Sequence, residues 1–161
     1  MTTTAVYPGT FDPITNGHSD LVNRATRMFD KVILAIADHP EKSPLFSLDE
    51  RISMARAVLG NNRNIEVVGF SGLLIDFAEQ VEAKILLRGL RAVSDFEYEF
   101  QLASMNRRLN CEIETVFLTP SENHTFVSAS LVKEIAKYQG EVGQFVHEHV
   151  FEALKAKYQR K

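Results

Sequence analysis

The residues best suited to chemistry follow the first apolar segment of the chain. A short apolar strand begins at Ala5, and residues 15–18 then read Thr-Asn-Gly-His before apolar residues repeat at helical spacing over 21–29. The first backbone N–H groups of a helix lack intrahelical partners and carry the positive end of its dipole. A glycine beside them lets an anion approach the backbone closely. This turn therefore predicts a phosphate-binding site with an ionisable ring, His18, at its rim, which indicates nucleotide chemistry.

His18 has a simpler interpretation, since an isolated histidine at a helix start usually does no more than hydrogen-bond locally. Its place directly after Gly17, in the turn that follows the first strand and its loop, favours the functional interpretation. A protonated or hydrogen-bond-donating imidazole beside a helix N-terminus can stabilise charge that develops on a phosphate oxygen. We therefore expect His18 to act on the transition state of a reaction at phosphorus.

A second candidate site surrounds Arg88 and Arg91. Arg88 directly follows the apolar run 85–87, and Gly89 lets the backbone turn at once. The planar guanidinium suits bidentate recognition of phosphate. The alternative is two solvated arginines, the usual fate of surface charge, but the position of Arg88 at the end of a buried strand favours phosphate binding.

Two further positions can contribute to an anion site. Lys42 lies in the loop 38–46, where two prolines predict that no helix forms. A loop lysine is usually only solvated, but this loop follows a strand expected beside the first one and can fold over the same crevice. Ser128 and Ser130 are expected to cap a helix, and a helix cap is also a place where phosphate binds.

The elements that position these residues alternate along the chain. Strands are expected from residue 5 and over residues 31–37, 65–70, 85–87 and 115–118, with helical patterns between and after them. Ser47 and Glu50 form a capping box before one of these helices. The pattern predicts an α/β, doubly wound (Rossmann-like) fold: a five-stranded parallel sheet of order 3-2-1-4-5, helices on both faces and a C-terminal helix. The whole chain, 1–161, is expected to form one domain, with the ligand crevice between strands one and four.

Composition excludes several classes of function. The net charge of −3 argues against a broad basic face for nucleic acid, and no apolar run is long enough for a signal sequence or membrane span. Cys111 is the only cysteine, so we expect neither an internal disulfide nor a cysteine metal site, in a reduced, cytoplasmic protein. His147 and His149 do not share a helix face, which disfavours zinc. The chain has no P-loop and no dinucleotide-binding glycine motif, and no activated serine or cysteine stands out.

The quoted motifs resemble a known family. Residues 7–13 and 15–18 resemble the T/H-x-G-H signature of the nucleotidyltransferase superfamily. Three later segments, residues 87–91, 95–99 and 130–134, make the chain similar to the bacterial phosphopantetheine adenylyltransferases over essentially its whole length. The resemblance implies transfer of AMP from ATP to 4′-phosphopantetheine, giving dephospho-coenzyme A and pyrophosphate, with Mg²⁺ bound through the ATP phosphates. It also implies a homohexamer with neither nucleic acid nor membrane as a partner.

The resemblance also implies roles for individual residues, carried over position by position. The residues implied in catalysis are His18, Lys42 and Arg91. The residues implied in binding phosphopantetheine are Thr10, Lys42, Leu74 and Arg88. The residues implied in binding ATP are Thr10, Phe11, His18, Gly89, Leu90, Arg91, Glu99, His124, Thr125, Phe126, Val127, Ser128, Ala129 and Ser130. Two of these depart from the family pattern: Ala129 replaces a common serine, and His124 stands where an aromatic residue such as tryptophan is frequent.

This chemistry suits the residues present. The acceptor's own phosphate is the nucleophile and pyrophosphate is a good leaving group, so alignment and cations around the α-phosphate suffice. Two alternatives remain open at this point. Another small-molecule nucleotidylyltransferase, acting on nicotinamide mononucleotide or glycerol phosphate, would share the His18 turn but not the later segments. A non-catalytic nucleotide sensor would bind ATP without releasing pyrophosphate.

Overall fold

The fold is built around one parallel sheet with the order predicted from the sequence. The computed structural model describes residues 1–91 and 93–159. Its strands occur in the order β3-β2-β1-β4-β5, and every neighbouring pair is parallel. The strands are β1 (Thr4–Gly9), β2 (Lys31–Ala37), β3 (Ile65–Phe70), β4 (Ile85–Gly89) and β5 (Glu114–Leu118). Because β1 lies between β2 and β4, the loops that follow these three strands open at one edge of the sheet.

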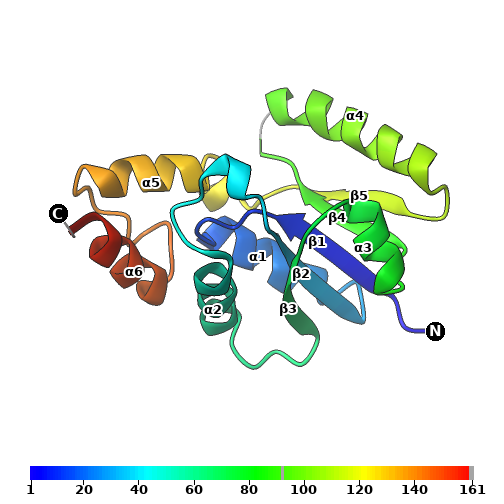
Figure 1. Ribbon diagram of the computed structural model, residues 1–161, viewed down its shortest axis with the longest axis horizontal. Coiled ribbons are helices and arrows are strands. Elements are labelled where there is room, and N and C mark those ends of the chain that lie inside the picture. Colours follow the sequence, from blue (N-terminus) through cyan, green and yellow to red (C-terminus); the bar gives the residue numbers. More distant parts are fainter. Residues whose placement is uncertain (92, 160–161) are drawn as a thin grey trace.

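Helices connect and follow the strands (Figure 1). They are α1 (Asn16–Ala25), α2 (Leu48–Leu59), α3 (Leu74–Gln80), α4 (Val93–Leu109), α5 (Ala129–Lys137) and α6 (Glu148–Gln159), with short 3₁₀ turns η1 (Pro40–Lys42) and η2 (Glu122–His124). The predicted Ser47–Glu50 capping box is present at the start of α2. None of the helices in the described ranges has the length and apolar character needed to cross a bilayer.

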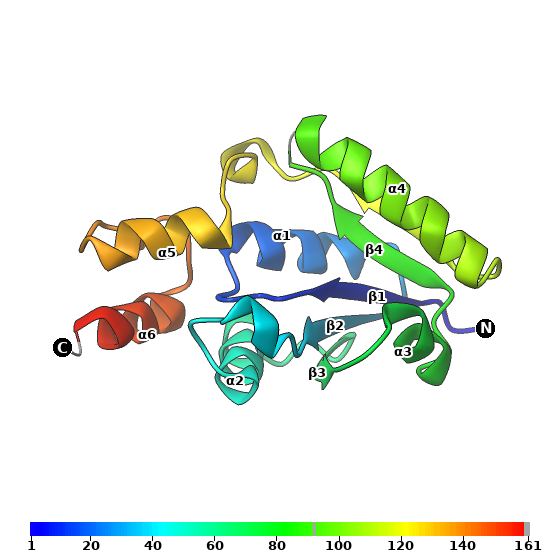
Figure 2. The ribbon, with the colours of Figure 1, turned by 45° about the horizontal axis from the view of Figure 1, so that its top comes forward.

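The two faces of the sheet bury separate cores, as expected for a doubly wound fold. One core cluster joins one face of the sheet to α1, α2, α5 and α6, through residues such as Leu34, Val22 and Leu154. The other cluster joins the opposite face to α3, through Ile33, Ile75 and neighbours. Figure 2 shows α4 running along the β4 end of the sheet, with α5 and α6 together at the opposite end of the molecule from the N-terminus. Six of the seven positions of β2 are buried, because helices cover both faces of the sheet at this central strand.

Two local features differ from the expectation. The first helix ends at Ala25, one turn before Met28, which is exposed. The prediction that the prolines of the loop 38–46 exclude helix is wrong for one short stretch, since Pro40 begins the 3₁₀ turn η1. Proline is compatible with the first position of a helical turn, because its fixed φ suits the turn and its missing N–H would have no partner there.

A buried arginine on α2 ties this loop to the ends of the first two strands. The Arg51 side chain is almost fully buried, with only 1% of its surface exposed. Its Nε donates to the Phe46 carbonyl at 3.1 Å, and its Nη1 donates to the carbonyls of Thr10 and Ala37 at 2.8 and 2.9 Å. The ends of β1 and β2 and the start of α2 are thereby held together beneath the edge of the sheet that carries the polar loops.

We expect Arg51→Met to lower the free energy of unfolding by roughly 2–4 kcal/mol, because each buried carbonyl left without a donor costs about 1–3 kcal/mol. Urea denaturation followed by circular dichroism measures this change. Arg63→Met, at an exposed arginine in the loop after α2, is the control and should stay within about 0.5 kcal/mol of the parent. Equal stability of the two variants would contradict the structural role given to Arg51.

Candidate active site

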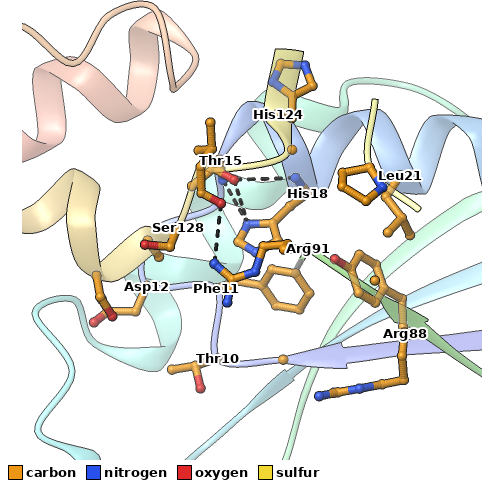
Figure 3. A pocket seen from close by; sticks show the side chains of 18 of the residues that line it. Thr10, Phe11, Asp12, Thr15, His18, Leu21, Arg88, Arg91, His124 and Ser128 are labelled. Carbon is orange, nitrogen blue, oxygen red and sulfur yellow. Dashed lines mark hydrogen bonds between the residues drawn. The ribbon is translucent and has the colours of Figure 1, made fainter. Parts of the chain in front are cut away.

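A cavity of about 470 Å³ lies at the carboxyl ends of β1 and β4, where the predicted crevice was expected (Figure 3). Its walls combine the loop after β1, the first turn of α1, the loop after β2, the end of β4 and the start of α5. The residues that line it are Tyr7, Pro8, Gly9, Thr10, Phe11, Asp12, Thr15, Gly17, His18, Leu21, Lys42, Pro44, Arg88, Gly89, Arg91, Glu99, Pro120, His124, Val127, Ser128, Ala129, Ser130 and Lys133. The main sequence-predicted clusters, around His18, Lys42, Arg88–Arg91 and Ser128–Ser130, therefore meet in one place.

His18 is held by a reciprocal cap at the start of α1. The Thr15 side chain accepts from the His18 backbone N–H at 3.4 Å, and the Thr15 backbone N–H donates to the His18 Nδ1 at 3.0 Å. Figure 3 shows these bonds beside Phe11 and Arg91. Histidine here takes the place of the glutamate that usually completes a capping box. Because Nδ1 accepts a backbone N–H, the ring proton lies on Nε2, and the neutral imidazole remains a hydrogen-bond donor at that atom.

The surroundings of His18 keep its ring neutral. Burial, and then the positive charge of Arg91, lower the pKa of His18 to about 4. The Phe11 ring packs edge-on against the imidazole, with ring centroids 4.9 Å apart. Phe11 has a φ of 47°, which non-glycine residues seldom adopt, and its ring lies so close to Gly9 that a Cβ there would come within 2.9 Å of it. The absence of a side chain at Gly9 thus lets the Phe11 ring occupy the position in which it packs against His18.

Arg88 is fixed in the wall of the cavity by Glu99 of α4. The guanidinium donates to both carboxylate oxygens, from Nε at 2.7 Å and from Nη2 at 2.6 Å, and its Nη1 donates to the Pro8 carbonyl at 3.3 Å. Burial opposes the charge on Arg88, but the hydrogen bonds and charge of Glu99 outweigh it and raise the pKa of Arg88. Burial likewise raises the pKa of the neighbouring Tyr7 hydroxyl. The resemblance assigned Arg88 and Glu99 to different substrates, whereas the structure pairs them in one bidentate ion pair.

The segment that follows β5 closes the cavity on the other side. Arg91 Nη1 donates to the Val127 carbonyl at 3.5 Å, and Ser128 caps α5 by accepting from the Leu131 N–H at 3.2 Å. A Cβ on Gly17 would lie 3.4 Å from the Cβ of His124, so η2 packs closely over the first turn of α1. The N-termini of two helices, α1 and α5, consequently border the same space.

Two lining residues were not identified as functional from the sequence. Asp12 accepts the backbone N–H groups of Leu45 and Phe46, at 2.9 and 3.0 Å, and pairs with Lys133 at 2.8 Å. Asp12 and Lys133 lie inside segments quoted for the family resemblance, residues 7–13 and 130–134. The resemblance is therefore the signal that could have identified them. Their pairing links positions 121 residues apart, which no local pattern could have predicted.

Some residues that the resemblance implied do not line this cavity. Leu74 packs with α3 into the second core cluster, and the Leu90 backbone N–H bonds to the Leu118 carbonyl at 3.0 Å. The Thr125 hydroxyl is engaged with carbonyls of its own turn, and Phe126 is 86% exposed. Their roles in binding stay predictions about substrate complexes.

The cavity is suited to binding anions. His18, Lys42, Arg88, Arg91 and Lys133 supply donors or positive charge, and the first turns of α1 and α5 add backbone N–H groups. Among the side chains that the structure describes, Asp12 and Glu99 are the acidic ones that line the cavity, and both are paired with cations. Those described side chains include no group of three or more His, Cys, Asp or Glu that could hold a metal ion. A polyphosphate and a second phosphate could therefore meet here, bound by protein cations.

Solved structures of similar fold include adenylyltransferases. A bifunctional NMN adenylyltransferase/ADP ribose pyrophosphatase from Francisella tularensis superposes with a TM-score of 0.73 at 16% identity, over 99% of this chain and 52% of that one. A nicotinic acid mononucleotide adenylyltransferase from Plasmodium falciparum, complexed with NaAD, superposes with a TM-score of 0.71 at 14% identity, over 99% of this chain and 97% of that one. The chain thus spans about half the length of the Francisella protein. At these identities the likeness establishes the fold.

The sequence itself matches the profile of one family, described as cytidylyltransferase-like, over residues 6–135. That match includes the His18 turn, the Lys42 loop, the Arg88–Arg91 turn and the start of α5. Because the match extends over most of the chain, this protein belongs to the cytidylyltransferase-like family.

Proposed function

We propose that this protein transfers the adenylyl group of ATP to 4′-phosphopantetheine, releasing pyrophosphate and forming dephospho-coenzyme A. The observation that carries the proposal is the convergence of His18, Lys42, Arg88 and Arg91 on one cavity at the carboxyl ends of β1 and β4. Family membership supports nucleotidyl transfer, and the segments 87–91, 95–99 and 130–134 support this acceptor.

The reaction needs neither a protein nucleophile nor a base. An oxygen of the acceptor's phosphate attacks the α-phosphorus of ATP, and the bond from that phosphorus to the oxygen bridging the α- and β-phosphates breaks. Pyrophosphate takes the bonding electrons and leaves. The protein's contribution is then to align the two phosphates and to stabilise the charge on the oxygens of the α-phosphate.

In this proposal the Nε2–H group of His18 donates a hydrogen bond to a nonbridging oxygen of the α-phosphate. The Thr15 N–H at Nδ1 fixes the tautomer that can donate, and the cap holds the ring at the start of α1. A neutral donor of fixed orientation stabilises developing charge without having to be reprotonated at neutral pH. Its role is that of an oxyanion-hole donor.

Lys42 and Arg88 are proposed to bind the acceptor's phosphate. Arg88 enters the cavity with its orientation set by Glu99, which lowers the entropy lost when it binds an anion. The pantetheine arm would extend along the carboxyl ends of β2 and β3, where Leu73 is an exposed apolar residue in the turn before α3. Leu74 follows directly, as the resemblance implied.

ATP is proposed to occupy the side of the cavity bordered by Arg91 and the start of α5. Mg²⁺ would enter as part of the MgATP substrate, since the carboxylates that line the cavity are already engaged with Arg88 and Lys133. The positive first turns of α1 and α5 favour the triphosphate.

Association of copies into the homohexamer implied by the resemblance is also part of the proposal. It is supported by apolar side chains that α4 leaves exposed: Phe96, Phe100, Met105 and Leu109. Phe96 and Phe100 stack on each other, with centroids 5.8 Å apart. Large exposed apolar side chains on one helix are common where a protein contacts another protein.

A second candidate acceptor is nicotinic acid mononucleotide. The observation in its favour is that the Plasmodium structure of similar fold is an adenylyltransferase for this nucleotide. Among the residues that line the cavity, the aromatic rings of Tyr7 and Phe11 pack against each other and against His18, so neither offers an open face for a nicotinate ring. This disfavours the second acceptor.

Pyrophosphate release with ATP, Mg²⁺ and a panel of acceptors tests the proposal. We expect turnover with 4′-phosphopantetheine, weak or no turnover with nicotinic acid mononucleotide, nicotinamide mononucleotide or glycerol 3-phosphate, and none with unphosphorylated pantetheine, which lacks the attacking phosphate. Preference for a mononucleotide, or turnover with pantetheine itself, would refute the assignment.

His18→Ala should reduce kcat by about 10²–10³, with ATP affinity changed only a few-fold, because the lost donor acts mainly in the transition state. Steady-state kinetics and equilibrium titration of ATP measure the two effects separately. Circular dichroism serves to check that the variant is folded. An intact kcat in a folded variant would remove His18 from the chemistry.

The tautomer and charge of His18 are directly measurable in the free protein. Long-range ¹H–¹⁵N NMR should show Nε2 protonated and Nδ1 unprotonated, with titration only as the pH approaches about 4. In the unfolded chain this side chain has its ordinary pKa of 6.5. Between pH 4 and pH 6.5 the unfolded chain therefore binds more protons at His18 than the folded chain does. The stability contributed by neutral His18 is therefore complete above pH 6.5 and is lost as the pH falls toward 4. The His18→Gln variant assigns the resonance, and titration of His18 near pH 6.5 would contradict the proposed environment.

A further inference from the structure

We propose that Asp12 and Lys133 are positioning residues that hold the loop carrying Lys42 and the start of α5 at a fixed spacing across the cavity. The kinetic part of this inference rests on the proposed function, because it assigns Lys42 to the acceptor and α5 to ATP. The structural part does not. In this view the pair contacts neither substrate but determines whether the two phosphates meet in line.

Asp12 is the point where three segments of the cavity wall join. Its side chain is only 4% exposed. One carboxylate oxygen, Oδ1, accepts the Phe46 N–H at 3.0 Å, and the other, Oδ2, accepts both the Leu45 N–H at 2.9 Å and the Lys133 ammonium at 2.8 Å. The loop after β1, the loop after β2 and α5 are thus connected through one carboxylate.

The connection to Lys42 is short and stiff. The Phe46 carbonyl accepts from the buried Arg51, so the backbone at residues 45–46 is held by a negative group at its N–H and a positive group at its carbonyl. Between this point and Lys42 the chain turns through Ser43, whose φ of 48° and backbone bond to the Pro40 carbonyl close the η1 turn. A shift of the 45–46 backbone would therefore move Lys42.

The connection to α5 runs through the helix itself. Lys133 lies in the second turn of α5, five residues after the Ser128 cap, and it lines the cavity while its ammonium pairs with Asp12. A helix transmits a displacement along its axis with little distortion. The Asp12–Lys133 pair therefore sets how far the first turn of α5 stands from the loop that bears Lys42.

A lysine in this place could instead bind a phosphate directly, and the two roles have different kinetic signatures. A direct phosphate ligand contributes to the KM of its own substrate. A positioning pair contributes to alignment, for which a displacement of about 1 Å can cost about 10²-fold in rate. The effect of losing the pair should accordingly appear in kcat and be shared between Asp12 and Lys133.

The test compares Lys133→Met, Asp12→Asn and the double variant with Lys137→Met, a matched change one turn further along α5 and outside the cavity lining. Trypsin cleavage after Lys42 in the folded protein measures the anchoring of the loop without reference to activity. We expect cleavage to become about 10-fold faster in Asp12→Asn and several-fold faster in Lys133→Met. The Lys137→Met variant should behave as the parent does.

Kinetics with ATP and the acceptor complete the test. We expect kcat per folded protein to fall about 10- to 100-fold in Lys133→Met, with both KM values within about three-fold of the parent, and Lys133→Arg to restore most of the rate. The double variant should be no slower than Asp12→Asn alone, since both changes break one link. Unchanged cleavage and kcat in Lys133→Met, a selective rise in one KM, or additive losses in the double variant would overturn the inference. If the parent turned over no acceptor, the proposed function would fail, and the cleavage assay would still decide whether the link exists.

Discussion

The parallel pairing of β1 between β2 and β4 is the constraint on which the rest of the site depends. It brings the ends of three strands to one edge of the sheet, although β1 ends at Gly9 and β4 begins only at Ile85. Each strand end then continues into a loop with different chemistry: the His18 turn, the Lys42 loop and the Arg88–Arg91 turn. These three loops together bring the cations of the cavity to one place. The buried Arg51 contacts two of the three strand ends, because it donates to the carbonyls of Thr10 and Ala37 after β1 and in β2.

The polar and charged side chains of the site are oriented by hydrogen-bond partners. The Thr15 N–H fixes the His18 tautomer, Glu99 fixes the Arg88 guanidinium, and Asp12 holds Lys133. His18 and Arg88, which are proposed to act on substrate, are thus oriented before substrate arrives, which lowers the entropic cost of assembling a transition state with several negative charges. The acidic partners also reduce the repulsion between neighbouring cations of the cavity. The site consequently gathers several cations in a chain whose net charge is −3.

Much of the fold and part of the site could be predicted from the sequence. The features that could not be predicted share one property, since they depend on the three-dimensional surroundings of a residue. The apolar run 31–37, the Ser47–Glu50 cap and the alternation of strands with helices indicated the fold, because each is a local signal of a few adjacent residues. The His18 turn could be identified because it begins the helix that follows the first strand, and Arg88 because it directly follows the apolar run 85–87. The Asp12–Lys133 and Arg88–Glu99 pairs, and the burial of Arg51, could not, since they depend on contacts between distant segments. Even the state of His18 needed the structure, because an ordinary helix-start histidine and a neutral, tautomer-fixed donor look alike in a sequence.

In the proposed reaction the site works by alignment and charge, with direct transfer between two bound phosphates. The stereochemical course at the α-phosphorus tests it most directly, using a single diastereomer of adenosine 5′-O-(1-thiotriphosphate) and determining the configuration of the phosphorothioate product. A direct in-line displacement predicts inversion. Retention would require two displacements and hence an adenylylated side chain, with His18 and the cavity's hydroxyls as candidates, and would contradict the account given for this cavity.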